Sequence, residues 1–188
     1  MRVLSKTKLR MDKEEKAIVL DYLPHGYFGQ EKMVPVAQAI GTSHFTLLQL
    51  VPRKGVSLQL KEEVYIGAGK RDQISYILGR LPGDKLTETA RINLQEFVKN
   101  AVESDEQKFV EFFNKADSIN TRLHQLELLP GFGRRHTGSI LHEREKKPFE
   151  SFKEMHERIK SLPDVRKAIE RRILDEIEKD EKYKLFVR

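Results

Sequence analysis

Residues 126–141 read Leu126-Glu127-Leu128-Leu129-Pro130-Gly131-Phe132-Gly133-Arg134-Arg135-His136-Thr137-Gly138-Ser139-Ile140-Leu141. The apolar residues up to Leu129 predict a short helix, and Pro130 predicts a sharp turn directly after it. Gly131 and Gly133 allow backbone conformations that a Cβ atom would hinder. A second helix is expected to begin near Arg134. The stretch therefore predicts two helices joined by a tight turn.

The spacing of these residues resembles the helix-hairpin-helix motif, Leu-x-x-Leu-Pro-Gly-apolar-Gly-x-x-x-Ala-x-x-Ile. The matching positions are Leu126, Leu129, Pro130, Gly131, Phe132, Gly133 and Ile140. The sequence departs from the motif at Thr137, where the motif usually has Ala, and Thr is a small replacement. In this reading Phe132 fills the gap between the two helices.

The start of the second helix has the chemistry of an anion site. Its first amides have no partner inside the helix, and the helix dipole favours negative charge there. Arg134 and Arg135 lie in that first turn, and no acidic residue occurs from position 128 to 142. We therefore predict nucleic-acid contacts at Gly131, Phe132, Gly133, Arg134 and Arg135. The alternative is an ordinary helical hairpin with its arginines in solvent.

A weaker copy of the turn follows at Leu162-Pro163-Asp164-Val165-Arg166. Both glycines are replaced, and Asp164 places negative charge where a phosphate would bind. Residues 152–177 are thus expected to form a degenerate second hairpin with a structural role. A basic face could still be supplied by Arg166, Lys167, Arg171 and Arg172.

The first half of the chain has the pattern of short strands. Apolar runs separated by turn residues occupy residues 17–23, 34–40, 45–51, 56–60 and 64–66. Short strands with no helix between them are typical of a small antiparallel barrel, with the OB-like barrel as leading candidate and another barrel topology as alternative. Residues 71–81 carry apolar residues at helical spacing, so the barrel domain (17–85) is expected to end in a helix.

The second half is expected to be all-helical. Apolar residues recur at helical spacing in 86–102, 109–116, 152–162 and 165–177. Ser104 and Ser151 each precede an acidic or amide residue by three positions, a pattern that predicts a capping box. The predicted fold class is therefore multidomain α and β, with a small OB-like antiparallel β-barrel followed by an all-α domain (86–188) that contains the helix-hairpin-helix (122–146).

Longer stretches resemble an archaeal family, domain-of-unknown-function family 655. They are Ala17–Pro24, Val64–Gly67, Lys70–Asp72, Asn120–Gly131 and Glu143–Phe152. The resemblance covers nearly the whole chain from about residue 15. It implies an OB-like barrel joined to a helix-hairpin-helix domain that binds nucleic acid. It also implies a place in translation or ribosome biogenesis, which favours RNA, and it implies no enzymatic activity.

The charge of the chain is unevenly distributed. The 188 residues carry 35 Lys and Arg against 29 Asp and Glu, a net charge of +6. Residues 1–16 hold six basic and three acidic groups and are expected to be a flexible basic tail, and residues 122–147 have the same balance. Lys70 and Arg71 follow Gly67-Ala68-Gly69, which fails the P-loop spacing but leaves both side chains as secondary candidates for phosphate contacts.

Composition excludes several functions. The absence of Cys removes disulfides, thiol nucleophiles and Cys-bound metals, and the six His residues show no metal-binding spacing. No apolar stretch approaches the roughly 20 residues that span a membrane. Together with the family resemblance, which is what favours RNA over DNA, these observations predict a cytoplasmic, non-catalytic nucleic-acid-binding protein without cofactor, metal or small-molecule substrate. The alternatives are an adaptor in ribosomal or transcription assemblies and, least favoured, an enzyme acting on nucleic acid.

Overall fold

The computed structural model describes residues 13–188, which form two compact units, one up to Arg80 and one from Leu81 to Arg188. We predicted the boundary near residue 85, and the structure places it between Arg80 and Leu81. Most of the predicted flexible tail lies outside the described residues. Its last part, residues 13–16, is ordered: Glu14 is buried, and its carboxylate accepts hydrogen bonds from the amides of Ser43 and His44, both at 2.9 Å.

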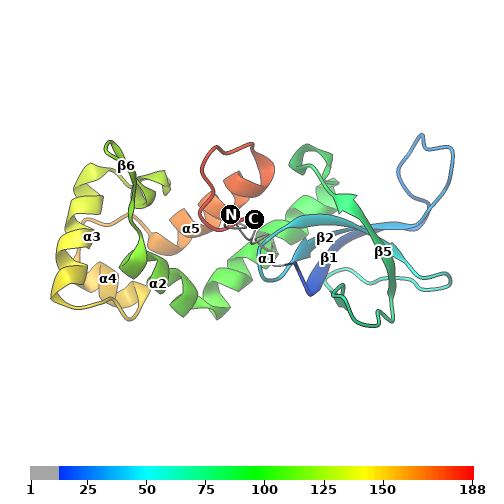
Figure 1. Cartoon of the computed structure of the whole chain (residues 1–188), viewed down its shortest axis with the longest axis horizontal. Helices are drawn as coiled ribbons and strands as arrows, with labels where there is room; N and C mark the ends of the chain where they lie inside the picture. Colours follow the sequence, from blue (N-terminus) through cyan, green and yellow to red (C-terminus); the bar gives the residue numbers. More distant parts are fainter. Residues whose placement is uncertain (1–12) are drawn as a thin grey trace, which may run out of the picture. The chain divides into compact units, whose positions relative to one another are not determined.

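The first unit is a curled, open antiparallel sheet (Figure 1). Its strands are β1 (Lys16–Leu23), β2 (Val36–Gly41), β3 (Leu47–Pro52), β4 (Glu63–Tyr65) and β5 (Ile74–Arg80), paired in the order β4-β1-β2-β3-β5. Because β4 and β5 are the two edges and do not pair, the sheet is not a closed barrel. The hydrophobic core of this unit is a cluster of buried side chains from the sheet that includes Val19, Ala39, Leu50 and Val64.

Two of our predictions for this unit are wrong. Residues 56–60 form no strand, although Leu58 is buried, because the backbone of β1 pairs with residues 61–65 instead. Residues 74–80 form strand β5 rather than a helix. The pairing of β5 with β3 shifts twice, so Leu50 lies opposite Ile77 and Pro52 opposite Ile74. These bulges break the period of two and give the apolar residues a spacing that also fits a helix.

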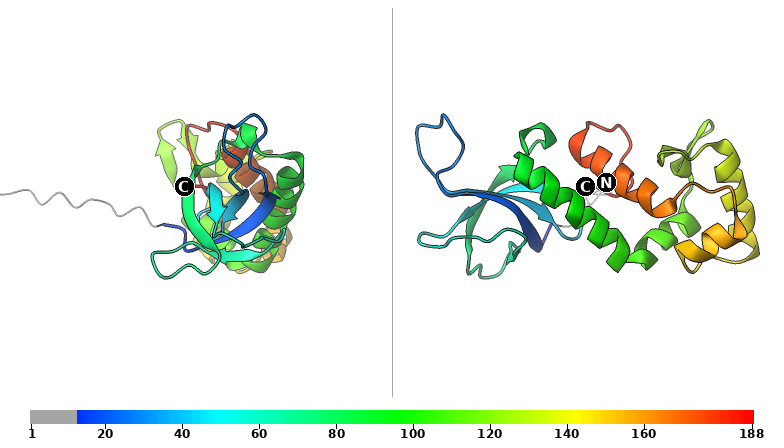
Figure 2. Two further views of the ribbon diagram at one scale, coloured as in Figure 1. Left: turned by 90° about the vertical axis from the view of Figure 1, so that its right-hand side faces the viewer. Right: turned by 180° about the vertical axis from the view of Figure 1, so that it is seen from behind.

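The second unit is mainly helical. Its α-helices are α1 (Glu88–Ser104), α2 (Glu106–Lys115), α3 (Arg134–Lys146), α4 (Phe152–Arg158) and α5 (Val165–Glu178), with short 3₁₀ helices η1 (Gly83–Lys85) and η2 (Gln125–Leu128). Figures 1 and 2 show α1 beside α5, and the two helices are in contact. A small hairpin, β6 (Ser118–Asn120) and β7 (Leu123–His124), precedes η2, so the prediction of an all-helical half is wrong there.

Caps fix several helix ends. The predicted cap at Ser151 is confirmed, since its hydroxyl accepts from the amide of Glu154 at 3.1 Å. The predicted cap at Ser104 is wrong, because its hydroxyl donates back to the carbonyl of Asn100 at 2.8 Å and α2 starts after Asp105. At the end of α2, Arg144 of α3 donates to the carbonyls of Phe113 and Ala116. The α3 helix is thereby held against α2.

Aromatic packing and one buried ion pair close the second unit. Phe186 packs edge-on against Phe109 and Phe112, with ring centroids 5.6 and 5.0 Å apart. The buried Glu176 carboxylate accepts from Arg172 Nε at 2.7 Å and from the amides of residues 185, 186 and 187. The end of the chain is therefore fastened to α5 by both apolar and charged contacts.

Candidate nucleic-acid interface

The turn between η2 and α3 is set by its glycine and its apolar residues. Gly131 has φ +81°, a conformation that favours glycine, while a Cβ atom there would only reach ordinary contact with Pro163. The amide of Phe132 donates to the carbonyl of Leu129 at 3.0 Å and closes the turn. The short helix expected to end at Leu129 is the 3₁₀ helix η2, which follows directly on the β6–β7 hairpin.

The Phe132 side chain points into the second unit and is 6% exposed. Its ring lies 6.1 Å from that of Phe113 in α2 and 5.8 Å from the imidazole of His136. A ring buried in this way packs inside the protein, and the predicted nucleic-acid contact at Phe132 stays a prediction. The ring packs the turn against α2. This agrees with the expectation that Phe132 fills a gap between helices.

The first turn of α3 has no hydrogen bond from its amides to a side chain of the N-cap residue. Gly133 is the N-cap residue, and the first helical bond runs from the amide of Thr137 to its carbonyl. The amide of Gly133 donates to His136 Nδ1 at 3.2 Å, so this predicted phosphate donor is already occupied. Among the described residues, the amides of Arg134, Arg135 and His136 have no acceptor. The amides available to an anion are therefore those that follow Gly133 in the first turn of α3, and not the amide of Gly133 itself.

Arg134 and Arg135 are exposed, and neither forms an ion pair with a described residue. Arg122, in the hairpin just before η2, is also exposed and unpaired within residues 13–188. Elsewhere in this unit, ion pairs or hydrogen bonds occupy the guanidinium groups of Arg91, Arg144, Arg158, Arg166, Arg171 and Arg172. Unpaired guanidinium groups are thus concentrated around one turn.

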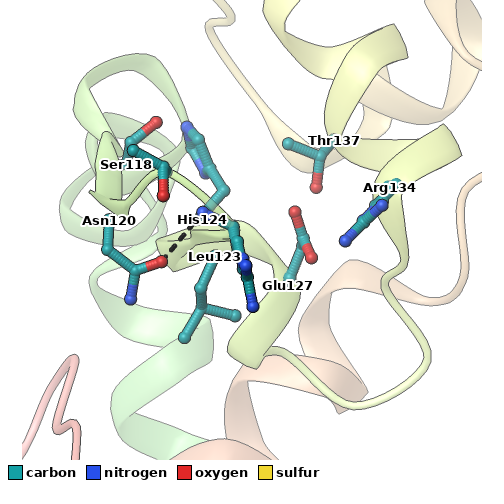
Figure 3. Close-up of a pocket in the computed structure, with 9 residues that line it drawn as sticks. Ser118, Asn120, Leu123, His124, Glu127, Arg134 and Thr137 are labelled. Atoms are coloured by element: carbon teal, nitrogen blue, oxygen red, sulfur yellow. Dashed lines mark hydrogen bonds between the residues drawn. The ribbon is translucent and has the colours of Figure 1, made fainter.

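A pocket of about 480 Å³ lies beside this turn, between the β6–β7 hairpin and α3 (Figure 3). Arg122 and Arg134 line it, together with Thr137, Glu127 and His124. In the part of the chain that the structure describes, Thr137 Oγ1 is a buried polar atom with no hydrogen-bond partner. Thr137 is buried, as expected of a small residue between packed helices, and it is also one of the residues that line the pocket.

His124 lines this pocket, and its hydrogen bond defines the tautomer of its imidazole. Its Nδ1 accepts from the amide of Leu126 at 3.1 Å, which requires an unprotonated Nδ1. Burial, and then the positive charge of Arg144, hold the pKa of His124 below its usual value. The imidazole is therefore neutral, with its proton on Nε2.

Glu127 is the feature that sequence reasoning missed. It lies one position before the acid-free stretch, yet it lines the same pocket as Arg134. Its carboxylate accepts no hydrogen bond and forms no ion pair within residues 13–188. A signal was available, because a short helix followed by a turn brings Glu127 back beside the start of the next helix.

The second predicted group lies in the first unit, and we describe it on its own. Arg71 Nε donates to the carbonyl of Gly67 at 2.8 Å, and Arg53 Nε donates to the carbonyl of Arg71 at the same distance. The amide of Gly69 donates to the Tyr65 hydroxyl at 3.0 Å. These hydrogen bonds hold residues 67–71 in a compact loop. The Lys70 side chain is exposed, whereas the Arg71 side chain is half-buried and partly occupied.

The degenerate second turn is closed by its own carboxylate. Asp164 caps α5 by accepting from the amide of Lys167 at 3.0 Å, and Arg166 pairs with Glu103 at 3.0 Å. Arg172 is buried with Glu176, and Arg171 pairs with Asp175. The basic face that we considered for this hairpin is therefore largely neutralised.

Residues 13–188 contain no group of three or more His, Cys, Asp or Glu side chains arranged to bind a metal ion. None of the described helices has both the length and the apolar character needed to cross a membrane. The cytoplasmic location stays a prediction.

Comparison with known proteins identifies the family. The model of the family described as "Protein of unknown function (DUF655)" matches residues 13–188. The uncharacterized protein MJ0038 of Methanocaldococcus jannaschii is 43% identical over 177 residues, which are 93% of this chain and 80% of the relative. The crystal structure of Af1531 from Archaeoglobus fulgidus is similar with a TM-score of 0.80 and 42% identity, and it covers 93% of this chain and 100% of the other. The predicted resemblance is thus confirmed, and the chain belongs to the DUF655 family.

Proposed function

We propose that this protein binds nucleic acid, RNA in preference to DNA, without catalysing a reaction on it, and that it acts in translation or ribosome biogenesis. The observation that carries the proposal is the set of unpaired guanidinium groups at one turn. Arg122, Arg134 and Arg135 have no described partner, while other arginines of the same unit are paired. The first amides of α3 lie beside them and add donors for an anion.

The chemistry of this group suits backbone phosphates. A guanidinium group donates two parallel hydrogen bonds to a phosphate, and unpaired amides at a helix start add a favourable dipole. Cations in the first turn of a helix oppose that dipole unless an anion is bound. Phosphate contacts position a nucleic acid without reading its bases, so we expect binding that depends little on sequence.

The fold supports the same proposal. The tight turn at Gly131, the buried Phe132 and the open start of α3 support the helix-hairpin-helix reading. The curled five-stranded antiparallel sheet of residues 16–80 supports the OB-like reading. In that unit we assign Lys70 a secondary phosphate contact, and Phe28, whose ring is fully exposed, a stacking contact with a base.

The test is a titration of labelled single-stranded RNA, duplex RNA and duplex DNA over a series of salt concentrations. The variant R134A/R135A removes two charges from the first turn of α3, and R166A/K167A removes two from the first turn of α5 as a matched control. We expect the log–log salt slope for single-stranded RNA to become shallower by about one to two units in the first variant, since each lost phosphate contact contributes roughly 0.7. The control should keep the slope of the wild type.

Equal slopes for the wild type and R134A/R135A would contradict the assigned site. If no nucleic acid binds better than heparin, which is a polyanion without bases, the proposed function is wrong and the adaptor function takes its place. RNA turnover that is lost on replacing a single carboxylate would contradict the non-catalytic assignment.

A further inference from the structure

Two polar groups in the pocket beside α3 lack partners of their own. Thr137 is 6% exposed, and its Oγ1 is buried without a hydrogen bond to any described residue. The Glu127 carboxylate also has no bond to a described residue. Figure 3 shows Glu127, Thr137 and Arg134 directed at the same space. Buried polar groups are normally satisfied, so an unsatisfied hydroxyl facing a pocket points to a ligand atom.

The charges of the pocket are divided. Arg134 and Arg122 attract an anion, whereas the Glu127 carboxylate repels one and only accepts hydrogen bonds. A free phosphate would satisfy the arginines and oppose Glu127. A ligand that carries a phosphate and, close to it, a hydroxyl donor satisfies both. The sugar–phosphate unit of a ribonucleotide has this arrangement, because its 2′-hydroxyl can donate to a carboxylate and accept from a threonine hydroxyl.

The size and lining of the pocket favour the sugar over the base. The volume of about 480 Å³ lies within the range of small-ligand sites. Its lining includes polar residues such as Ser118 and Asn120, and it contains no Phe or Tyr on which a base could stack. The amide of Arg122 donates to Asn120 Oδ1 at 2.9 Å, which holds the hairpin wall in place. A polar pocket without an aromatic stacking partner suits a ribose better than a base.

We propose that this pocket binds one ribose–phosphate unit of single-stranded RNA, with the phosphate at Arg134 and the first amides of α3 and the 2′-hydroxyl between Glu127 and Thr137. This inference rests on the proposed function and adds the basis for choosing RNA over DNA. Deoxyribose has no 2′-hydroxyl, so it leaves Glu127 and Thr137 unsatisfied. Selectivity for RNA then comes from two side chains and does not depend on sequence.

The experiment measures the affinities of the full chain for oligo(U), oligo(dU) and 2′-O-methyl oligo(U) of equal length. For the wild type we expect oligo(U) to bind about tenfold more tightly than the other two, the effect of one charge-assisted hydrogen bond. E127Q and T137V should each lower this ratio, E127Q because its neutral amide oxygen still accepts but without the charge, while the oligo(dU) affinity stays the same or rises. E145Q removes the same charge from the exposed face of α3 and should keep the wild-type ratio.

Both variants should fold, because neither Glu127 nor Thr137 bonds to a described residue through its side chain, and their thermal unfolding provides the check. Equal wild-type binding of oligo(U) and oligo(dU), or an unchanged ratio in folded E127Q and T137V, would overturn the ribose site while leaving RNA binding intact. Failure of all three oligonucleotides to bind would overturn both the site and the proposed function.

Discussion

The first turns of α3 and α5 have similar sequences and opposite chemistry. Each follows a Leu-Pro turn, and each places basic residues in the first turn of the helix. In α5 the Asp164 carboxylate accepts an amide, and Arg166 is paired with Glu103. In α3 the N-cap is Gly133, which has no side chain, and Arg134 and Arg135 are unpaired within the described residues.

This difference separates a structural helix start from one that is available to a ligand. The start of any helix carries unsatisfied donors and partial positive charge, and a nearby carboxylate stabilises both. The α5 helix uses a carboxylate of its own chain. At α3 the equivalent acceptor is missing while the cations are present, which is the basis for proposing that an external anion binds there. If the comparison is right, α5 variants change stability and α3 variants change binding.

The largest effect on stability is expected at Glu176, which closes the far end of α5. Replacing it with Ala leaves Arg172 buried and unpaired and removes the acceptor for the amides of residues 185–187. We expect a loss of about 3–5 kcal/mol in the free energy of unfolding, measured by denaturant titration. E178A removes a partly exposed ion pair with Arg91 and should cost less than about 1 kcal/mol. Equal losses would contradict the assigned role of Glu176.

A smaller effect is expected when Asp164 is replaced with Ala. The loss of this cap should lower the free energy of unfolding by about 1 kcal/mol, while D164N, which keeps an acceptor, should stay close to the wild type. RNA affinity should not change in either variant, because the Asp164 turn is a structural one. A clear change in RNA affinity for D164A would show that the two turns are not divided as described.

The smallest effect on stability is expected from a change of pH, through protonation of His124 in strand β7. Its pKa is lowered in the folded state by burial and by Arg144, so the unfolded state takes up the proton first as pH falls. This contribution to stability is complete above about pH 6.5 and decreases below it. The melting temperature should therefore fall less on acidification in H124N, whose side-chain oxygen can still accept the Leu126 amide. An identical fall in wild type and H124N would contradict the shift.

The helical half was largely predictable, because its signals are local. The cap at Ser151 and the start of α3 at Arg134 follow from short patterns, and the structure has both. The short hairpin that ends at His124 was not predictable in this way, since two strands of two or three residues leave no measurable period. The failure at Ser104 has a similar cause: its hydroxyl had a competing acceptor in the preceding turn.

The sheet and the pocket depend on contacts between distant residues, which no local pattern reports. Strand β5 was misread because bulges placed Ile74 and Ile77 on one face at helical spacing. In the candidate site, Arg134 and Arg135 could be found from the motif. The pocket could not, because it forms only when the hairpin at Arg122 and the carboxylate of Glu127 are folded back beside Thr137.

The central claim, that the open start of α3 binds a phosphate of RNA, is tested most directly at Gly133. Its backbone, with φ −119° and ψ −175°, suits any residue, and a Cβ atom there meets nothing within 4 Å. G133D would give α3 the carboxylate cap that α5 already has, and G133N would give it a neutral cap of the same size. The measurement is the affinity of both variants for single-stranded RNA, with their melting temperatures as the check of folding.

We predict that G133D melts at or above the wild-type temperature and binds RNA about 10- to 30-fold more weakly, the effect of roughly 1.4–2 kcal/mol at a helix start. G133N should lose less, since it occupies an amide but adds no charge. Wild-type RNA affinity in a folded G133D would contradict the claim.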